Sequence, residues 1–135
     1  MISTLNVWAV LAAFVPYFVL GALWFTVFFS RPYRRSLGRD ERTPTPNAPI
    51  FIVGPMLCMA VITVTTAVLM QWLAIESPLA AFAFAILVGL GYLVTNTLNI
   101  AINPNIPKPV LYAFITGSYH LIGVTLACFI LLALG

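Results

Sequence analysis

Residues 110–134 read VLYAFITGSYHLIGVTLACFILLAL and include no Asp, Glu, Lys or Arg. A transmembrane helix needs about 20 consecutive apolar residues to cross a hydrocarbon core of about 30 Å, so this stretch belongs in a bilayer. Three other uncharged stretches of similar length precede it, at 5–29, 50–74 and 79–102. The sequence therefore predicts an all-α integral membrane protein, folded as a bundle of four transmembrane helices.

The overall composition points the same way. Hydrophobic residues make up 62% of the chain and charged residues only 7%, against about 25% charged in a soluble domain. The four stretches and their short loops use the whole chain, so we expect a single membrane domain over residues 1–135 and no second, soluble domain. The apolar runs are continuous, which argues against β-barrel strands, in which apolar and polar residues alternate.

All six basic residues fall on one side of this arrangement. They are Arg31, Arg34, Arg35, Arg39 and Arg42 in the loop at 30–49, and Lys108 in the loop between the third and fourth helices. Short basic loops stay in the cytoplasm. We therefore expect these two loops to be cytoplasmic, both termini to lie outside, and the protein to reside in the plasma membrane. The formal net charge of +3 reflects this topology, and we expect no nucleic-acid partner.

The first half of the loop at 30–49 has the pattern of a short interfacial helix. Pro32 suits its first turn, and arginines surround its apolar positions. Arg31, Arg34 and Arg35 are therefore candidate ligands of anionic lipid headgroups, since each basic side chain near an anionic membrane contributes about 1 kcal/mol. The alternative is a solvated loop whose arginines only fix the orientation of the chain.

Uncharged polar residues recur inside the spans at similar depths. In the third helix, a stripe with steps of three and four reaches Tyr92, Asn96 and Asn99, which places these residues on one predicted face. Counting about 1.5 Å of rise per residue from the loops brings this face level with polar positions of the other helices. We expect a polar layer near the bilayer midplane that binds a small molecule or an ion. Its candidate residues are Tyr17, Thr63, Tyr92, Asn96, Asn99, Thr116 and His120.

His120 is the residue of this layer whose ordinary pKa lies between pH 5 and 8. An ionisable residue inside a span indicates a functional site by default. The alternative is structural, because a neutral histidine bonded to a neighbouring helix holds two helices together, and such contacts average about 0.6 kcal/mol. Both interpretations stay open at this point.

Catalytic and metal chemistry find little support. One histidine and two cysteines are too few for a closed zinc site within one chain. Ser118 and His120 point to different sides of a helix, and no span contains an acidic residue. No nucleotide-binding or metalloprotease motif is present. We therefore expect a protein that is not an enzyme and uses no metal or cofactor. Without a membrane carboxylate, proton-coupled export of cationic drugs is also disfavoured.

Small residues recur at every fourth position of three helices, a spacing that lets helix backbones approach closely. They are Ala9 and Ala13, then Ala81, Ala85 and Gly89, then Gly123 and Ala127. A bundle of four helices does not need all of these faces. We therefore expect a homo-oligomer, most simply a homodimer.

Three short motifs carry a resemblance to a known family. They are Gly21-Ala22-Leu23-Trp24-Phe25 in the first helix, Thr95-x-x-x-Asn99 in the third and Gly117-Ser118-Tyr119-His120 in the fourth. Together they resemble the small bacterial four-helix membrane family known as domain of unknown function 1761. The resemblance implies the four-helix fold and the importance of Trp24, Asn99 and His120, but no activity.

Two classes of function follow from these observations. The first is binding or permeation of a small molecule or an ion through the polar layer near the midplane. The second is an accessory or scaffold subunit whose helices and arginine-rich loop contact lipids or another membrane protein. A polar cavity that reaches His120 would favour the first class.

Overall fold

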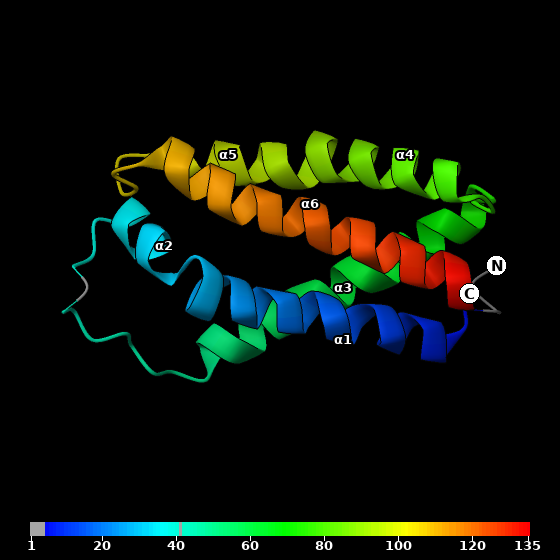
Figure 1. Ribbon diagram of the computed structural model, residues 1–135, viewed down its shortest axis with the longest axis horizontal. Helices are drawn as coiled ribbons and strands as arrows, with labels where there is room; N and C mark the ends of the chain where they lie inside the picture. Colours follow the sequence, from blue (N-terminus) through cyan, green and yellow to red (C-terminus); the bar gives the residue numbers. More distant parts are fainter. Residues whose placement is uncertain (1–4, 41) are drawn as a thin grey trace.

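The computed structural model describes residues 5–40 and 42–135, and in these ranges every regular element is a helix. Figure 1 shows a long, narrow bundle. Its α-helices are α1 (Val7–Leu23), α2 (Ser30–Ser36), α3 (Ile50–Trp72), α4 (Pro78–Val88), α5 (Thr95–Ala101) and α6 (Pro109–Leu134). Two π-helical turns, η1 (Trp24–Phe28) and η2 (Gly89–Val94), continue α1 and join α4 to α5.

Within the described residues, four helical segments are long and apolar enough to cross a membrane. They are Val7–Phe28, Ile50–Trp72, Pro78–Ala101 and Pro109–Leu134, each 22 to 26 residues long with a mean hydropathy of 1.9 to 2.2. These segments confirm the predicted four-helix membrane fold. The predicted first span ran unbroken to residue 29, whereas here the regular helix gives way to a π turn after Leu23.

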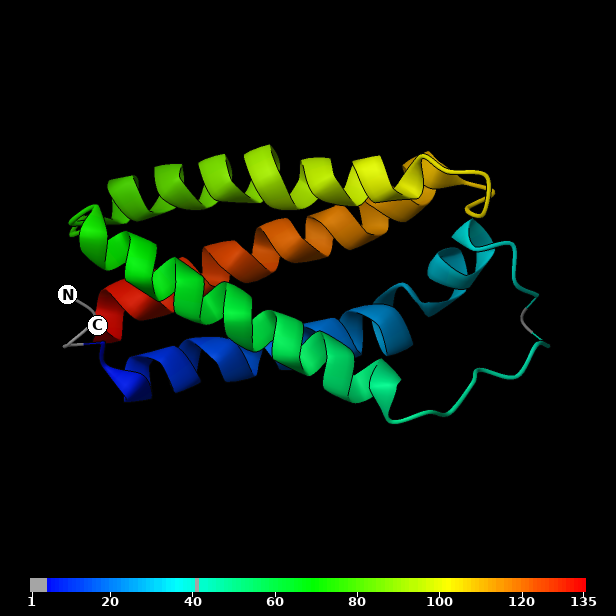
Figure 2. The same ribbon diagram turned by 180° about the vertical axis from the view of Figure 1, so that it is seen from behind.

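The four spans run alternately up and down, so both described ends of the chain lie together (Figures 1 and 2). Asn6 connects the two ends. Its side-chain oxygen caps α1 by accepting from the Trp8 and Ala9 amides, and its Nδ2 donates to the Leu134 carbonyl at the end of α6 at 2.7 Å. We call this end of the bundle the terminal end. The opposite end, which holds α2 and the loops at 37–49 and 102–108, is the basic-loop end.

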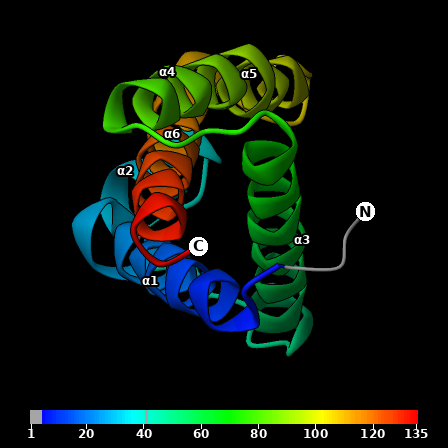
Figure 3. The same cartoon turned by 90° about the vertical axis from the view of Figure 1, so that its right-hand side faces the viewer.

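Helix α6 is the central element of the bundle. It contacts α1, α2, α3, α4, η2 and α5. In the view along the bundle, α6 lies between α1 and the α4–α5 segment, and α3 forms the opposite side (Figure 3). The side chains of α6 that face its neighbours therefore meet residues from every other span.

The small residues with four-residue spacing are packed inside this bundle. Ala9, Ala13, Ala81, Ala85 and Ala127 are all at most 1% exposed, and the glycines of these stripes are also buried. The expectation of a homodimer rested on spare small-residue faces, and these faces are not spare. If the chain pairs with another, it does so through a different surface.

The π turn η2 changes which residues of the third span face the bundle. The Thr95 amide donates to the Leu90 carbonyl, five residues back, and the Thr95 hydroxyl donates to the same oxygen at 2.7 Å. A π turn holds more residues than an α turn, so beyond Gly89 the inward stripe continues in steps of four residues. Its members are Ala81, Ala85, Gly89, Leu93, Thr97 and Ala101, all buried or half-buried.

Candidate functional site

Two tyrosines and a histidine form a polar cluster inside the bundle. Tyr17 of α1 is 0% exposed, and its hydroxyl lies 3.1 Å from Nδ1 of His120 on α6. The two rings meet edge to face, with centroids 6.5 Å apart. The tautomer of the imidazole decides which group donates. The structure thus brings together two residues predicted for the midplane layer.

Two glycines allow α1 and α6 to approach closely enough for this contact. The Tyr17 ring lies against Gly123, where a Cβ atom would overlap the ring. Reciprocally, a Cβ on Gly21 would lie 2.7 Å from the hydroxyl of Tyr119. Each helix thus contributes Tyr-x-x-x-Gly, and the two motifs face each other in antiparallel order. We call this four-residue contact the tyrosine–glycine clasp.

Helix α3 joins the cluster through Met59. The Tyr119 hydroxyl lies 3.0 Å from Sδ of Met59 and 3.4 Å from the Tyr17 carbonyl. Thr63, predicted for the polar layer, is fully buried, and its hydroxyl donates to the Met59 carbonyl at 2.8 Å. Three spans are therefore connected by one set of polar contacts.

Thr116, also predicted for the layer, lies one turn before His120 on α6. Its Oγ1 is buried, and among the described residues it has no hydrogen-bond partner. A buried hydroxyl without a partner is costly, because it loses its hydrogen bonds to water and gains none in return. The Thr116 hydroxyl is therefore available to bind another group.

Three residues predicted for the layer lie elsewhere. Tyr92 is 73% exposed, and Asn96 and Asn99 are exposed as well. The prediction that they share the interior with His120 is wrong. It assumed an unbroken α-helix, in which a stripe with steps of three and four stays on one face. The π turn η2 adds a residue to one turn, so Thr97 and Ala101 take the inward positions and the asparagines face outward.

Sequence reasoning missed part of the cluster. Trp24 was singled out only by the family resemblance, and no hydrogen bond was predicted for it. Its Nε1 donates to the Ile115 carbonyl of α6 at 2.9 Å, and the residue is half-buried. Tyr119 and Met59 were not predicted as members of the polar layer. A signal for Tyr119 existed in the repeat of Tyr-x-x-x-Gly in the first and fourth spans.

At the basic-loop end, Arg34 organises the loop that follows α2. Its guanidinium donates to the Thr45 hydroxyl at 3.1 Å, to the Asp40 carbonyl at 2.8 Å and to the Thr43 carbonyl. Arg31 and Arg35 are exposed on α2. Of the three candidate headgroup ligands, Arg34 is thus engaged with its own loop.

Helix α2 is attached to the start of α6. The Lys108 amide donates to the Ser36 carbonyl at 3.2 Å, and the rings of Tyr33 and Tyr112 lie 5.8 Å apart. Burial, with a further contribution from Tyr112, raises the pKa of Tyr33 to about 12. The Tyr33 phenol therefore stays neutral at physiological pH, and α2 is fixed to the bundle.

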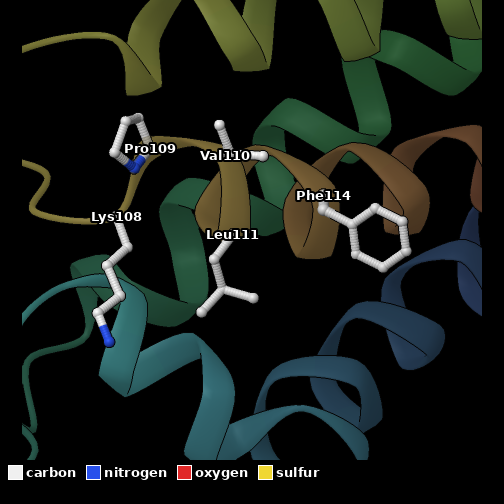
Figure 4. Close-up of a pocket in the computed structure, with 5 residues that line it drawn as sticks. All are labelled: Lys108, Pro109, Val110, Leu111 and Phe114. Carbon is white, nitrogen blue, oxygen red and sulfur yellow. The ribbon is translucent and has the colours of Figure 1, made fainter.

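Along α6, in the part of the chain that the structure describes, lie two shallow surface hollows that are almost wholly apolar. The first lies at the start of α6 and is lined by Lys108, Pro109, Val110, Leu111 and Phe114 (Figure 4). The second lies further along α6 and is lined by Leu121, Ile122, Thr125, Leu126 and Phe129. His120 lines neither of them.

A comparison with protein families identifies the group to which the chain is related. A family model described as "Protein of unknown function (DUF1761)" matches residues 8–132. The chain belongs to this family. The match includes nearly all of the four spans and confirms the resemblance carried by the motifs around Trp24, Asn99 and His120. Searches among curated proteins and among solved structures found no match.

Proposed function

We propose that this protein is a non-catalytic membrane subunit that associates laterally with protein in the bilayer through one face of its third span. The observation that carries the proposal is the outward position of Tyr92, Asn96 and Asn99 on that span. We call these three residues, together with the neighbouring Gly91 and Thr95, the outward polar face. All five are exposed.

The outward polar face lies at a depth in the membrane where polar groups need a hydrogen-bond partner. The third span covers Pro78–Ala101, so Asn96 lies about 7.5 Å and Tyr92 about 13.5 Å from its basic-loop end by helical rise. A polar group left unpaired in hydrocarbon costs several kcal/mol. Polar residues within spans accordingly face other protein or water. A protein partner would supply the hydrogen bonds that lipid cannot.

The inward polar cluster supports a structural role instead. Tyr17, Tyr119 and Met59 bond to each other or to His120. Contacts of this kind join the helices of one chain and leave little for a partner. Under this proposal, the interior contacts hold the subunit together, and the outward polar face binds the partner protein.

A site-specific photocrosslinker tests the proposal in native membranes. Placed at Tyr92, it should form covalent adducts with protein, whereas the same group at Val61 should not. Val61 is 66% exposed on α3, outside the outward polar face, and serves as the control. The adducts at position 92 should disappear when Asn96 and Asn99 are both changed to Leu. Adducts of equal yield at both positions, or none at position 92, would refute lateral association through this face.

A second candidate function is binding of a small polar molecule beside His120. The buried Thr116 hydroxyl without a partner supports it, since a ligand that bonds to Thr116 and His120 would satisfy that group. The test is a pH-dependent binding or flux signal in vesicles between pH 5.5 and 8. The signal should disappear in His120→Gln and persist in Ser118→Ala, because the Ser118 hydroxyl only bonds its own helix. Absence of any signal from the wild-type protein would count against this candidate.

The proposed setting is a bacterial plasma membrane with both basic loops in the cytoplasm and anionic headgroups near Arg31 and Arg35. Single cysteines at the exposed positions Asn47 and Glu76, with Cys58 and Cys128 replaced, report the orientation. An impermeant thiol reagent applied to intact cells should label the cysteine at 76 and not the one at 47. The reverse pattern would place the arginine-rich loop outside.

A further inference from the structure

We propose that the partner at the outward polar face is a second copy of this chain, packed in parallel about a twofold axis perpendicular to the membrane. The inference rests on the lateral association proposed above and names its partner. It differs from the sequence-based expectation of a dimer, because the small-residue stripes behind that expectation are buried within one copy.

Orientation is the first reason for a second copy. All six Lys and Arg residues lie in α2, in the loop after it or in the loop before α6, at one end of the bundle, so every copy should insert in the same direction. Two copies that meet through the same span then run in parallel. Each outward residue faces the same residue of the other copy at the same depth, as a twofold interface requires.

The chemistry of the face is the second reason. A side-chain amide carries both donors and acceptors, so Nδ2 of Asn96 in one copy would donate to Oδ1 of Asn96 in the other, and the reverse. Asn99 would pair in the same way nearer the membrane surface. Buried asparagine pairs of this type define two-stranded association in coiled coils. The face has no charged residue, so it needs no partner of opposite charge.

The shape of the face is consistent with close approach. A Cβ atom added at Gly91 would meet nothing within 4 Å in this chain. Gly91, Thr95 and Asn99 follow each other at four-residue steps on the exposed side, which leaves room for a second backbone beside η2 and α5. The asparagines would supply the hydrogen bonds between the two copies, and Gly91 would allow their backbones to approach closely.

Energy transfer between labelled copies in vesicles tests the inference. The full chain, with Cys58 and Cys128 replaced, carries one donor or acceptor dye on Asn105→Cys, an exposed loop position outside the face. The vesicles contain only phosphatidylethanolamine and phosphatidylglycerol and no other protein. Transfer at high lipid dilution should exceed that of random encounter. Changing both Asn96 and Asn99 to Leu should lower the association constant at least tenfold, and Asn96→Gln should retain part of it.

A matched control replaces two lipid-facing residues of another span. Val61→Leu with Val64→Leu alters exposed positions of α3 and should leave transfer unchanged, while circular dichroism verifies that all variants remain helical. Transfer that survives in the asparagine double variant would overturn the inference, since the copies would then meet elsewhere. Absence of transfer in the wild-type chain would also overturn it. In that case, asparagine-dependent crosslinks to a different protein at Tyr92 in native membranes would leave the proposed lateral association standing.

Discussion

Polar residues occur in two regions of the bundle, the interior between α1 and α6 and the outward side of η2–α5. They are buried and hydrogen-bonded in the first region and exposed in the second. In the interior, Tyr17 is fully buried and bonded to His120. On the outside, Tyr92 and Asn96 are exposed within a membrane span. The contrast shows that a polar residue in a transmembrane sequence does not by itself indicate a binding site in the interior. Its partner has to be found first, either within the chain or outside it.

Glycines give the strongest test of this contrast. Gly123→Leu should destabilise the monomer by about 3 kcal/mol, because a side chain there must displace the buried Tyr17 ring. Gly91→Leu should leave the monomer unchanged or stabilise it by up to about 1 kcal/mol, since nothing lies near Gly91 and leucine favours helix. Denaturation with SDS in mixed micelles measures both. Equal losses from the two changes would contradict the assignment of inside and outside.

The next effect concerns the bond between Tyr17 and His120. Tyr17→Phe keeps the ring in the tyrosine–glycine clasp but removes the hydroxyl, so it should cost about 1 kcal/mol of monomer stability. His120→Gln should cost a similar amount. The double variant should cost less than the sum, because the two residues share one contact. Additive losses in the same micelle assay would mean that the bond contributes nothing.

Two threonines with buried hydroxyls allow a bonded hydroxyl to be compared with one that has no partner. Thr63→Val removes a bonded hydroxyl and should cost about 1 kcal/mol. Thr116→Val removes one without a partner and should be neutral or stabilising by up to about 1 kcal/mol. A clear loss of stability in Thr116→Val would instead indicate a water or a ligand bound at that position.

The smallest effect is expected for the outward polar face in a monomer. Asn96→Leu should change the stability of the isolated chain in micelles by no more than about 0.5 kcal/mol, as for other exposed positions. The same change should weaken association in vesicles. A loss of monomer stability of 2 kcal/mol or more would show that Asn96 belongs to the interior after all.

The sequence was sufficient for the fold because the charges mark where each span ends. The apolar stretch at 110–134 and its three counterparts required four helices, and α6 indeed covers Pro109–Leu134. The pairing of Tyr17 with His120 was only approximately foreseeable, from similar depths on two helices. Depth places residues along the bundle axis, but it does not say in which direction a side chain points around its helix.

The outward turn of the asparagines was not predictable from spacing. Helical spacing fixes a face only while 3.6 residues make one turn, and η2 departs from that value. Gly89 and Gly91 flank Leu90 in the sequence, yet neither glycine by itself indicates a π turn. The Trp24 bond to the Ile115 carbonyl was equally hidden, since any residue type supplies a carbonyl.

The π turn η2 also has a consequence for how this span tolerates changes in length. A π turn accommodates an inserted residue without rotating the helix on either side. Removing Gly91 should therefore restore an ordinary α-helix in which Gly89 and Thr97 still face α6. Members of the family that are one residue shorter in this segment should place their alignment gap between residues 89 and 94. They should keep the same inward and outward faces with a straight third helix.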